Sequence, residues 1–153
     1  FDIPKSPRVK IRVGDAGTVT RSFAPSSRDV VIRDVFAVDK TPVELTSVDF
    51  VRTVDHSLVP GGLYILNCGD GPLLDGARAE VAALFEMFEQ VCLVADAAML
   101  KGRRRGNIII AASHSPLPAA GSAEAAAISR TLMGGGVPAQ YRDSAQARQF
   151  ACL

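Results

Sequence analysis

The sequence contains no tryptophan, and aromatic residues make up only 6% of its 153 residues. Histidine occurs twice and cysteine three times. The cysteines Cys68, Cys92 and Cys152 are scattered and form no CxxC pair, which excludes a disulfide framework and the usual zinc motifs. We interpret them as small buried apolar residues of a reducing compartment, and we expect a cytoplasmic protein without a metal site.

Long apolar runs and an excess of charge of one sign are also missing. The apolar stretches are far shorter than the ~18 to 20 residues that a membrane-spanning helix needs, so we expect no membrane contact. The 17 basic residues nearly balance the 16 acidic ones. The run Arg103-Arg104-Arg105 lies between glycines without aromatic neighbours, which favours a solvated loop over a nucleic-acid site.

The composition, with 48% hydrophobic and 22% charged residues, is that of a globular domain. A chain of this length hides roughly 70% of the surface that its unfolded form exposes. We therefore expect a hydrophobic core that is stable without disulfides or a bound metal. We expect one domain over residues 1–153, and we interpret the start at Phe1 as that of a piece from a longer chain.

Strand and helix patterns alternate along the chain. We predict strands at 9–13, 29–34, 63–67, 91–95 and 107–113, and helices at 18–23, 46–58, 73–88 and 122–133. The continuous apolar run Val30-Val31-Ile32 is typical of a strand covered on both faces. The sequence therefore predicts an α/β domain with a mainly parallel sheet and helices on both faces.

Three polar groups follow predicted strands, where ligands bind in such sheets. They are Asp15 after Gly14, Asp34 with Asp39, and the turn that starts at Asn67. Asp15 is either a turn residue that binds its own backbone or a ligand of a flat heterocycle such as adenine. Asp34 is either a loop organiser or a carboxylate that accepts a proton from an amine.

The order of these motifs resembles that of the spermidine synthase-like proteins, aminopropyltransferases with an S-adenosylmethionine methyltransferase fold. The resemblance extends from about residue 3 to about residue 135. Its motifs are Ser6 to Val9, Gly14-Asp15-Ala16, Val30 to Asp34, Pro42 to Thr46, Asp49-Phe50, Leu58 to Gly62, Leu66-Asn67 and Gly102 to Ser113.

The resemblance implies a co-substrate that is decarboxylated S-adenosylmethionine or S-adenosylmethionine itself. Asp15 and the amide of Ala16 would contact its adenine, and Val35 would lie in the same binding site. Asp34 would be the catalytic carboxylate that positions and deprotonates the attacking amine of a diamine such as putrescine. Asp39 would bind the second amine.

Glu44 is a further substrate-binding candidate under the same resemblance. The family places a small hydroxyl residue after the catalytic aspartate and a second aspartate three positions on. Here Val35 and Phe36 follow Asp34, and Asp39 lies two positions further along the chain than the family's second aspartate would. Two alternatives therefore stay open: a methyltransferase that acts on another acceptor, and a non-catalytic member of the fold.

The resemblance also implies an incomplete sheet. A methyltransferase-type sheet has the strand order 3-2-1-4-5-7-6, and this chain would begin at strand 3 as the carboxyl-terminal part of such a domain. The first two strands, with the loop that grips the co-substrate, would be missing. We expect either a longer chain or a partner to supply them, and a homodimer is also open.

Overall fold

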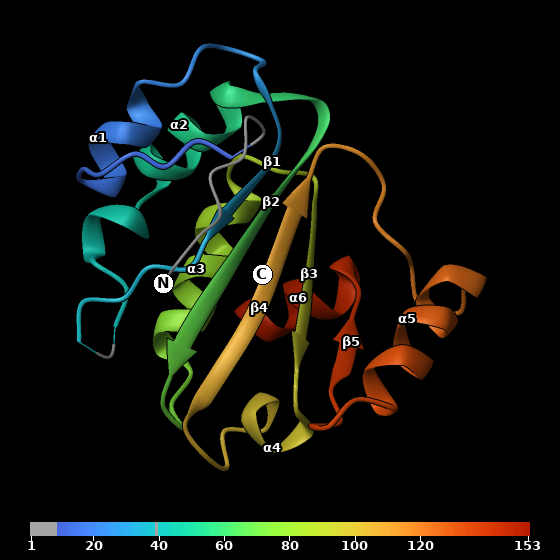
Figure 1. Ribbon diagram of the computed structural model, residues 1–153. Helices are drawn as coiled ribbons and strands as arrows, with labels where there is room; N and C mark the ends of the chain where they lie inside the picture. The colour runs from blue at the N-terminus through green and yellow to red at the C-terminus, as the bar shows by residue number, and fades with distance from the viewer. Residues whose placement is uncertain (1–8, 39) are drawn as a thin grey trace.

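The computed structural model describes residues 9–38 and 40–153. A five-stranded sheet forms its centre, and three helices lie against one side of it (Figure 1). The strands are β1 (Arg28–Arg33), β2 (Leu58–Asp70), β3 (Gln90–Ala95), β4 (Gly106–Ser113) and β5 (Gln140–Arg142). The helices are α1 (Ala16–Arg21), the 3-10 turn η1 (Val43–Leu45), α2 (Val48–Ser57), α3 (Asp75–Phe85), α4 (Ala97–Leu100), α5 (Ala123–Met133) and α6 (Ser144–Ala151).

The strand order is β1-β2-β4-β3-β5. Only β1 and β2 run parallel, and the three other pairs are antiparallel. The prediction of a mainly parallel sheet is therefore wrong. The link from β3 to β4 contains only the short helix α4, whereas a parallel crossover needs about a dozen residues or more. The order β1-β2-β4-β3 nevertheless equals strands 4-5-7-6 of the sheet that the resemblance implies.

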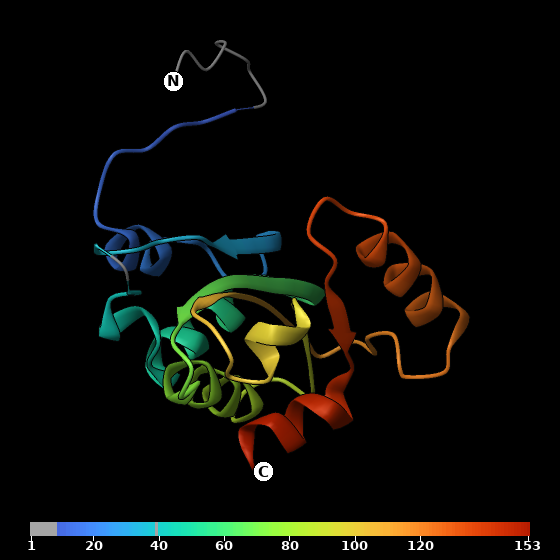
Figure 2. The ribbon, with the colours of Figure 1, turned by 90° about the horizontal axis from the view of Figure 1, so that it is seen from below.

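The core lies between the sheet and the helices α2, α3 and α6, which share one side (Figure 2). Alternate residues of β2 point into it, because side chains of a strand alternate between its faces. The largest fully buried side chains are Tyr64, Phe88, Leu66, Leu84, Leu93, Met99, Ile108 and Ile110. The helix α5 packs beside the edge strand β5.

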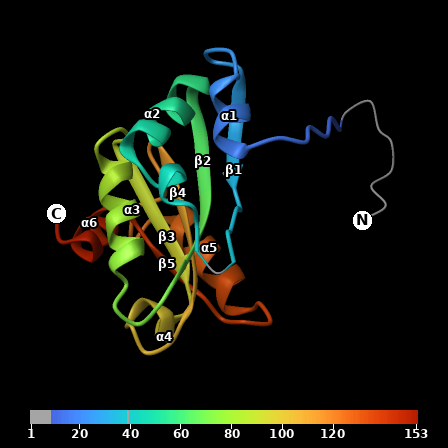
Figure 3. The ribbon, with the colours of Figure 1, turned by 90° about the vertical axis from the view of Figure 1, so that its left-hand side faces the viewer.

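The prediction that the strand at 29–34 is covered on both faces is wrong for the described residues. Val30 and Ile32 of β1 point away from the helices and are 47% and 68% exposed. Figure 3 shows the side view, in which α2, α3 and α6 lie to one side of the strands. Residues 9–13 form no strand either, and Val13 is fully exposed, since this segment has no neighbouring strand to pair with.

The other predicted elements are present with shifted ends. The helix predicted at 46–58 is α2, and its amino-terminal cap is Ser47, whose Oγ accepts a hydrogen bond from the Phe50 amide at 3.2 Å. The strand predicted at 63–67 is longer and begins at Leu58. The strand β2 continues through Pro60, Gly61 and Gly62, and its register with β1 is irregular there.

The weakly patterned tail carries two elements that were not predicted, β5 and α6. Asp143 caps α6 by accepting a hydrogen bond from the Gln146 amide at 2.9 Å, and the Gln146 side chain accepts one from the Asp143 amide. The same carboxylate accepts a hydrogen bond from the Ala120 amide at 2.8 Å. The Asp-x-x-Gln spacing is a capping-box signal that could have revealed this helix.

We expect Asp143→Ala to lower the free energy of unfolding by about 1 to 2 kcal/mol, because two backbone donors lose their acceptor. These backbone hydrogen bonds, that of Gln146 first, hold the pKa of Asp143 below its usual value of 3.8. The stabilisation is therefore present above pH 3.8 and is lost as the pH falls and the carboxyl becomes protonated. Urea unfolding at pH 7 and pH 3 checks both points, and equal stability of variant and wild type at pH 7 would contradict the assignment.

Candidate functional site

Asp34 directly follows β1 and projects from the face opposite the helices, as Ile32 does two residues earlier. Arg33 pairs with Leu66 in the parallel register, so Asp34 comes to lie beside Asn67 of β2. The Asn67 Nδ2 donates a hydrogen bond to Asp34 Oδ1 at 3.1 Å. Parallel pairing thus brings together two of the polar groups that the sequence indicated, and the amide orients the exposed carboxylate.

A buried ion pair lies on the other side of β1, directly behind Asp34. The Arg33 guanidinium donates to Glu80 Oε2 of α3 at 2.5 Å and to the Leu45 carbonyl of η1 at 2.8 Å. Arg33 and Glu80 are only 4% and 7% exposed. This one side chain therefore ties the end of β1 to α3 and to the loop that follows Asp34.

Burial dominates the electrostatics of this cluster. It raises the pKa of the Glu80 carboxyl, and the Arg33 charge counteracts that effect only in part. Burial also raises the pKa of the Cys68 thiol, and the negative charge of Glu80 adds to that effect. A thiol with a raised pKa stays neutral and is a poor nucleophile, so Cys68 is no candidate for covalent catalysis.

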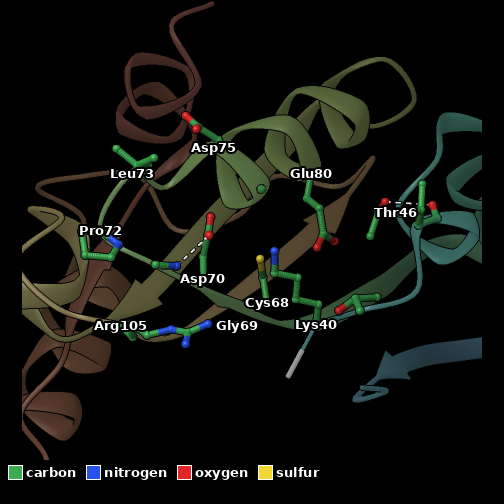
Figure 4. A pocket seen from close by; sticks show the side chains of 14 residues that line it. Lys40, Thr46, Cys68, Gly69, Asp70, Pro72, Leu73, Asp75, Glu80 and Arg105 are labelled. Atoms are coloured by element: carbon green, nitrogen blue, oxygen red, sulfur yellow. Dashed lines mark hydrogen bonds between the residues drawn. The ribbon is translucent and has the colours of Figure 1, made fainter. Parts of the chain in front are cut away.

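A cavity of about 540 Å³ opens at the carboxyl end of β2, toward the helical side. Lys40 and Thr46 from the loop after β1, Cys68 from β2 and Glu80 from α3 line it, together with Arg105 (Figure 4). Asp34 is not among its lining residues. The cavity and the Asp34 carboxylate therefore lie on different faces of the sheet.

Asp15 caps α1, and Ala16 is the first residue of that helix. The Asp15 carboxylate accepts hydrogen bonds from the Thr18 amide at 2.8 Å and the Thr18 hydroxyl at 2.7 Å. These bonds lower the pKa of Asp15. The Asp15 carboxylate thus binds nearby backbone, as the first of the two interpretations of this residue expected. A contact of Asp15 and Ala16 with adenine stays a prediction.

The remaining candidates lie on the segment after β1. Val35 is half-buried and packs against the core, and Glu44 is exposed in η1. Asp39 lies outside the described residues. The roles of all three in binding stay predictions.

The sequence interpretation missed the pair of Arg33 and Glu80. The signal for this pair in the sequence was Arg33, an arginine inside an apolar strand and directly before Asp34. Such a position requires a buried partner, because an unpaired buried charge is costly. The partner lies on a helix far along the chain, and sequence spacing does not identify it.

Within residues 9–38 and 40–153, no three His, Cys, Asp or Glu side chains gather in a way that would hold a metal ion. In the same part of the chain, no helix is both long and apolar enough to span a bilayer.

Comparison with solved structures identifies the family. The chain superposes on a probable spermidine synthase from Corynebacterium glutamicum with a TM-score of 0.93 and 55% sequence identity, over 98% of this chain. The chain belongs to the spermidine synthase-like family. It covers 54% of the C. glutamicum protein, so this family member spans about half the length of that relative.

A second comparison supports the fold of this spermidine synthase-like chain. The spermidine synthase from Thermotoga maritima matches with a TM-score of 0.57 over 96% of the chain, at 14% sequence identity. A likeness at that identity concerns the fold alone. Neither a protein-family model nor a curated protein matches the sequence.

Proposed function

We propose that this chain contributes the amine-handling part of an aminopropyltransferase, which moves an aminopropyl group from decarboxylated S-adenosylmethionine to putrescine or a related diamine. The observation that carries the proposal is the 55% identity with a probable spermidine synthase over nearly the whole chain. The position of Asp34 at the end of a strand, oriented by Asn67, supports it.

The proposed reaction is a nucleophilic displacement at the carbon bound to the sulfonium sulfur. The amine nitrogen forms the new C–N bond, the C–S bond breaks, and its electron pair stays on sulfur, so that methylthioadenosine leaves as a neutral thioether. Asp34 accepts the proton that the nitrogen loses. The protein supplies alignment and exclusion of water, which together with proton transfer account for most of the expected rate enhancement.

The other assignments follow from this reaction. Asp15, the amide of Ala16 and Val35 would contact the nucleoside of the co-substrate. A diamine is doubly charged at neutral pH, so its far amine needs an acidic partner. We propose Glu44 and Asp39 for that role, since both follow Asp34 on the segment between β1 and α2.

An activity measurement tests this proposal. In a chimera, this chain replaces the 54% of the C. glutamicum protein that it covers. We expect the chimera to form spermidine and methylthioadenosine from putrescine and decarboxylated S-adenosylmethionine, measured by mass spectrometry. The intact C. glutamicum protein is the control.

The result also distinguishes the alternatives. Methyl transfer from S-adenosylmethionine, without aminopropyl transfer, would favour the methyltransferase. A folded chimera that transfers neither group, beside an active control, would favour a non-catalytic member of the fold.

A further inference from the structure

Arg33 is a charged residue at a buried position that an apolar residue would ordinarily occupy. It is the last residue of β1, and only 4% of it is exposed. A buried ion pair usually adds little net stability, because removal of two charges from water costs about as much as their attraction gains. The Arg33 Nε is also buried without a hydrogen-bond partner among the described residues, which adds to that cost. Net stability therefore does not account for an arginine at this position.

The Arg33 guanidinium does provide a geometric tie between three elements. It extends from β1, donates to Glu80 Oε2 of α3 at 2.5 Å and donates to the Leu45 carbonyl of η1 at 2.8 Å. A guanidinium holds its donors in a rigid planar fork, which the ammonium group of a lysine does not offer. Two partners thus fix the orientation of the fork and, with it, the place of η1 relative to β1 and α3.

The segment between β1 and α2 is anchored mainly at its two ends. Val35 packs against the core at its beginning, whereas Val43 is 81% exposed. At the far end, the Leu45 side chain is buried in the core, and the Leu45 carbonyl accepts the hydrogen bond from Arg33. Glu44 directly precedes this anchored residue. The place of its carboxylate therefore depends on the contact between Arg33 and Leu45.

We propose that Arg33 is a positioning residue for the acceptor amine. Its hydrogen bond to the Leu45 carbonyl fixes the end of the segment that carries Glu44 and Asp39, the acidic residues proposed above for the far amine of a diamine. With Arg33 buried on the helical side, Asp34 points to the opposite side of β1, because successive side chains of a strand alternate. One residue thus sets the base and the partners of the far amine relative to each other. The inference rests on the proposed function, since it concerns the acceptor of that reaction.

Kinetics of the chimera with the double variant Arg33→Met/Glu80→Met test this role. Two methionines replace the ion pair without an unpaired buried charge, so the fold is kept while the donor to Leu45 is lost. We expect the KM for putrescine to rise at least about tenfold, because the far amine meets misplaced partners before and during the reaction. The kcat, and the KM for decarboxylated S-adenosylmethionine, should stay within about threefold of the wild-type values.

Asp143→Ala is the control for a loss of stability alone, because it removes the cap of α6 and leaves the contacts of Arg33 in place. It should change none of the three constants. A rise of less than tenfold in the KM for putrescine would overturn the proposal for the double variant. A parallel loss in all three constants would also overturn it, since a general structural defect affects them together.

Hydrogen exchange in this chain alone tests the tie if the wild-type chimera is inactive, a result that would count against the proposed function and not against this contact. The Leu45 and Thr46 amides donate to the Pro42 and Val43 carbonyls at 2.9 and 3.1 Å, so both amides are protected. In the double variant, nuclear magnetic resonance should show that these two amides exchange at least about tenfold faster, with unchanged exchange in β3 and β4. Unchanged exchange of the Leu45 and Thr46 amides would overturn the proposal. Equal acceleration in β3 and β4 would do the same, because the whole fold would then be loosened.

Discussion

Asp34→Asn should lower the kcat of the chimera by about a hundredfold to ten-thousandfold, because it removes the proposed proton acceptor and keeps the shape of the side chain. The asparagine can still meet Asn67, which donates to Asp34 Oδ1 in the wild type. The loss should therefore be one of rate, with a smaller change in KM for putrescine. Initial rates of spermidine formation over a range of putrescine concentrations measure both constants.

Two further variants make this result specific. Glu124→Gln removes an exposed carboxylate in the first turn of α5, away from β1, and should leave kcat unchanged. Asn67→Ala removes the hydrogen bond that orients Asp34 and should lower kcat by about tenfold, in line with the value of a hydrogen bond to a charged group. If Asp34→Asn and Glu124→Gln transfer the aminopropyl group at the same rate, Asp34 is not the base.

Arg33→Met should lower the free energy of unfolding of this chain by about 3 to 5 kcal/mol, because it leaves the Glu80 carboxylate buried without its partner. It also removes the hydrogen bond to the Leu45 carbonyl. Guanidinium-induced unfolding at pH 7 measures the loss. The double variant Arg33→Met/Glu80→Met should recover part of it, since two apolar side chains replace the pair without an unpaired charge.

The effect of Arg33→Met should depend on pH with a defined sign. Burial already raises the pKa of Glu80, and without the guanidinium that pKa rises further. A carboxyl with a higher pKa in the folded than in the unfolded protein reduces stability when it is ionised. The deficit of the variant should thus be smallest below pH 4.5, the ordinary value for glutamate, and should grow as the pH rises. A deficit that is independent of pH would contradict the ion pair as its cause.

Strand and helix positions were predictable wherever a local pattern decides them. The run Val30-Val31-Ile32 predicts β1, and the apolar spacing around Val54 predicts α2. What the pattern could not give is what lies on each side of a strand. The same apolar run fits a strand covered on two faces and one whose second face is open, as β1 is here.

The direction of the strands and the structure of the carboxyl-terminal tail depend on contacts between residues far apart in the sequence. The antiparallel entry of β4 between β2 and β3 follows from chain connections and not from the composition of any strand. β5 has three residues, too few for a periodic signal, and it is stabilised by pairing with β3.

The candidate site was predictable in part. A strand-end position pointed to Asp34, and the resemblance gave it a chemical role. The neighbour that orients it, Asn67, follows from the parallel register of β1 and β2, which the sequence suggests but does not determine. The buried support behind it, Arg33 with Glu80, joins residues 47 positions apart and could only be seen in the fold.

The candidate site adjoins the uncovered side of the sheet, where Val30 and Ile32 are exposed. Asp34 and Asn67 stand at the end of a bare apolar face, and the Asp15 cap lies on α1, which packs against α2. We therefore infer that the chain holds the amine-handling carboxylate and part of the nucleoside contacts, and that a second segment completes the nucleoside site.

Calorimetric titration with methylthioadenosine, the product that carries the nucleoside, tests that claim most directly. We expect saturable, one-to-one binding by the chimera and no measurable binding by this chain alone under the same conditions. Tight one-to-one binding by the chain alone would contradict the claim that part of the nucleoside site lies elsewhere. The absence of binding by a folded chimera would contradict the claim that Asp15 and Asp34 border a nucleoside site at all.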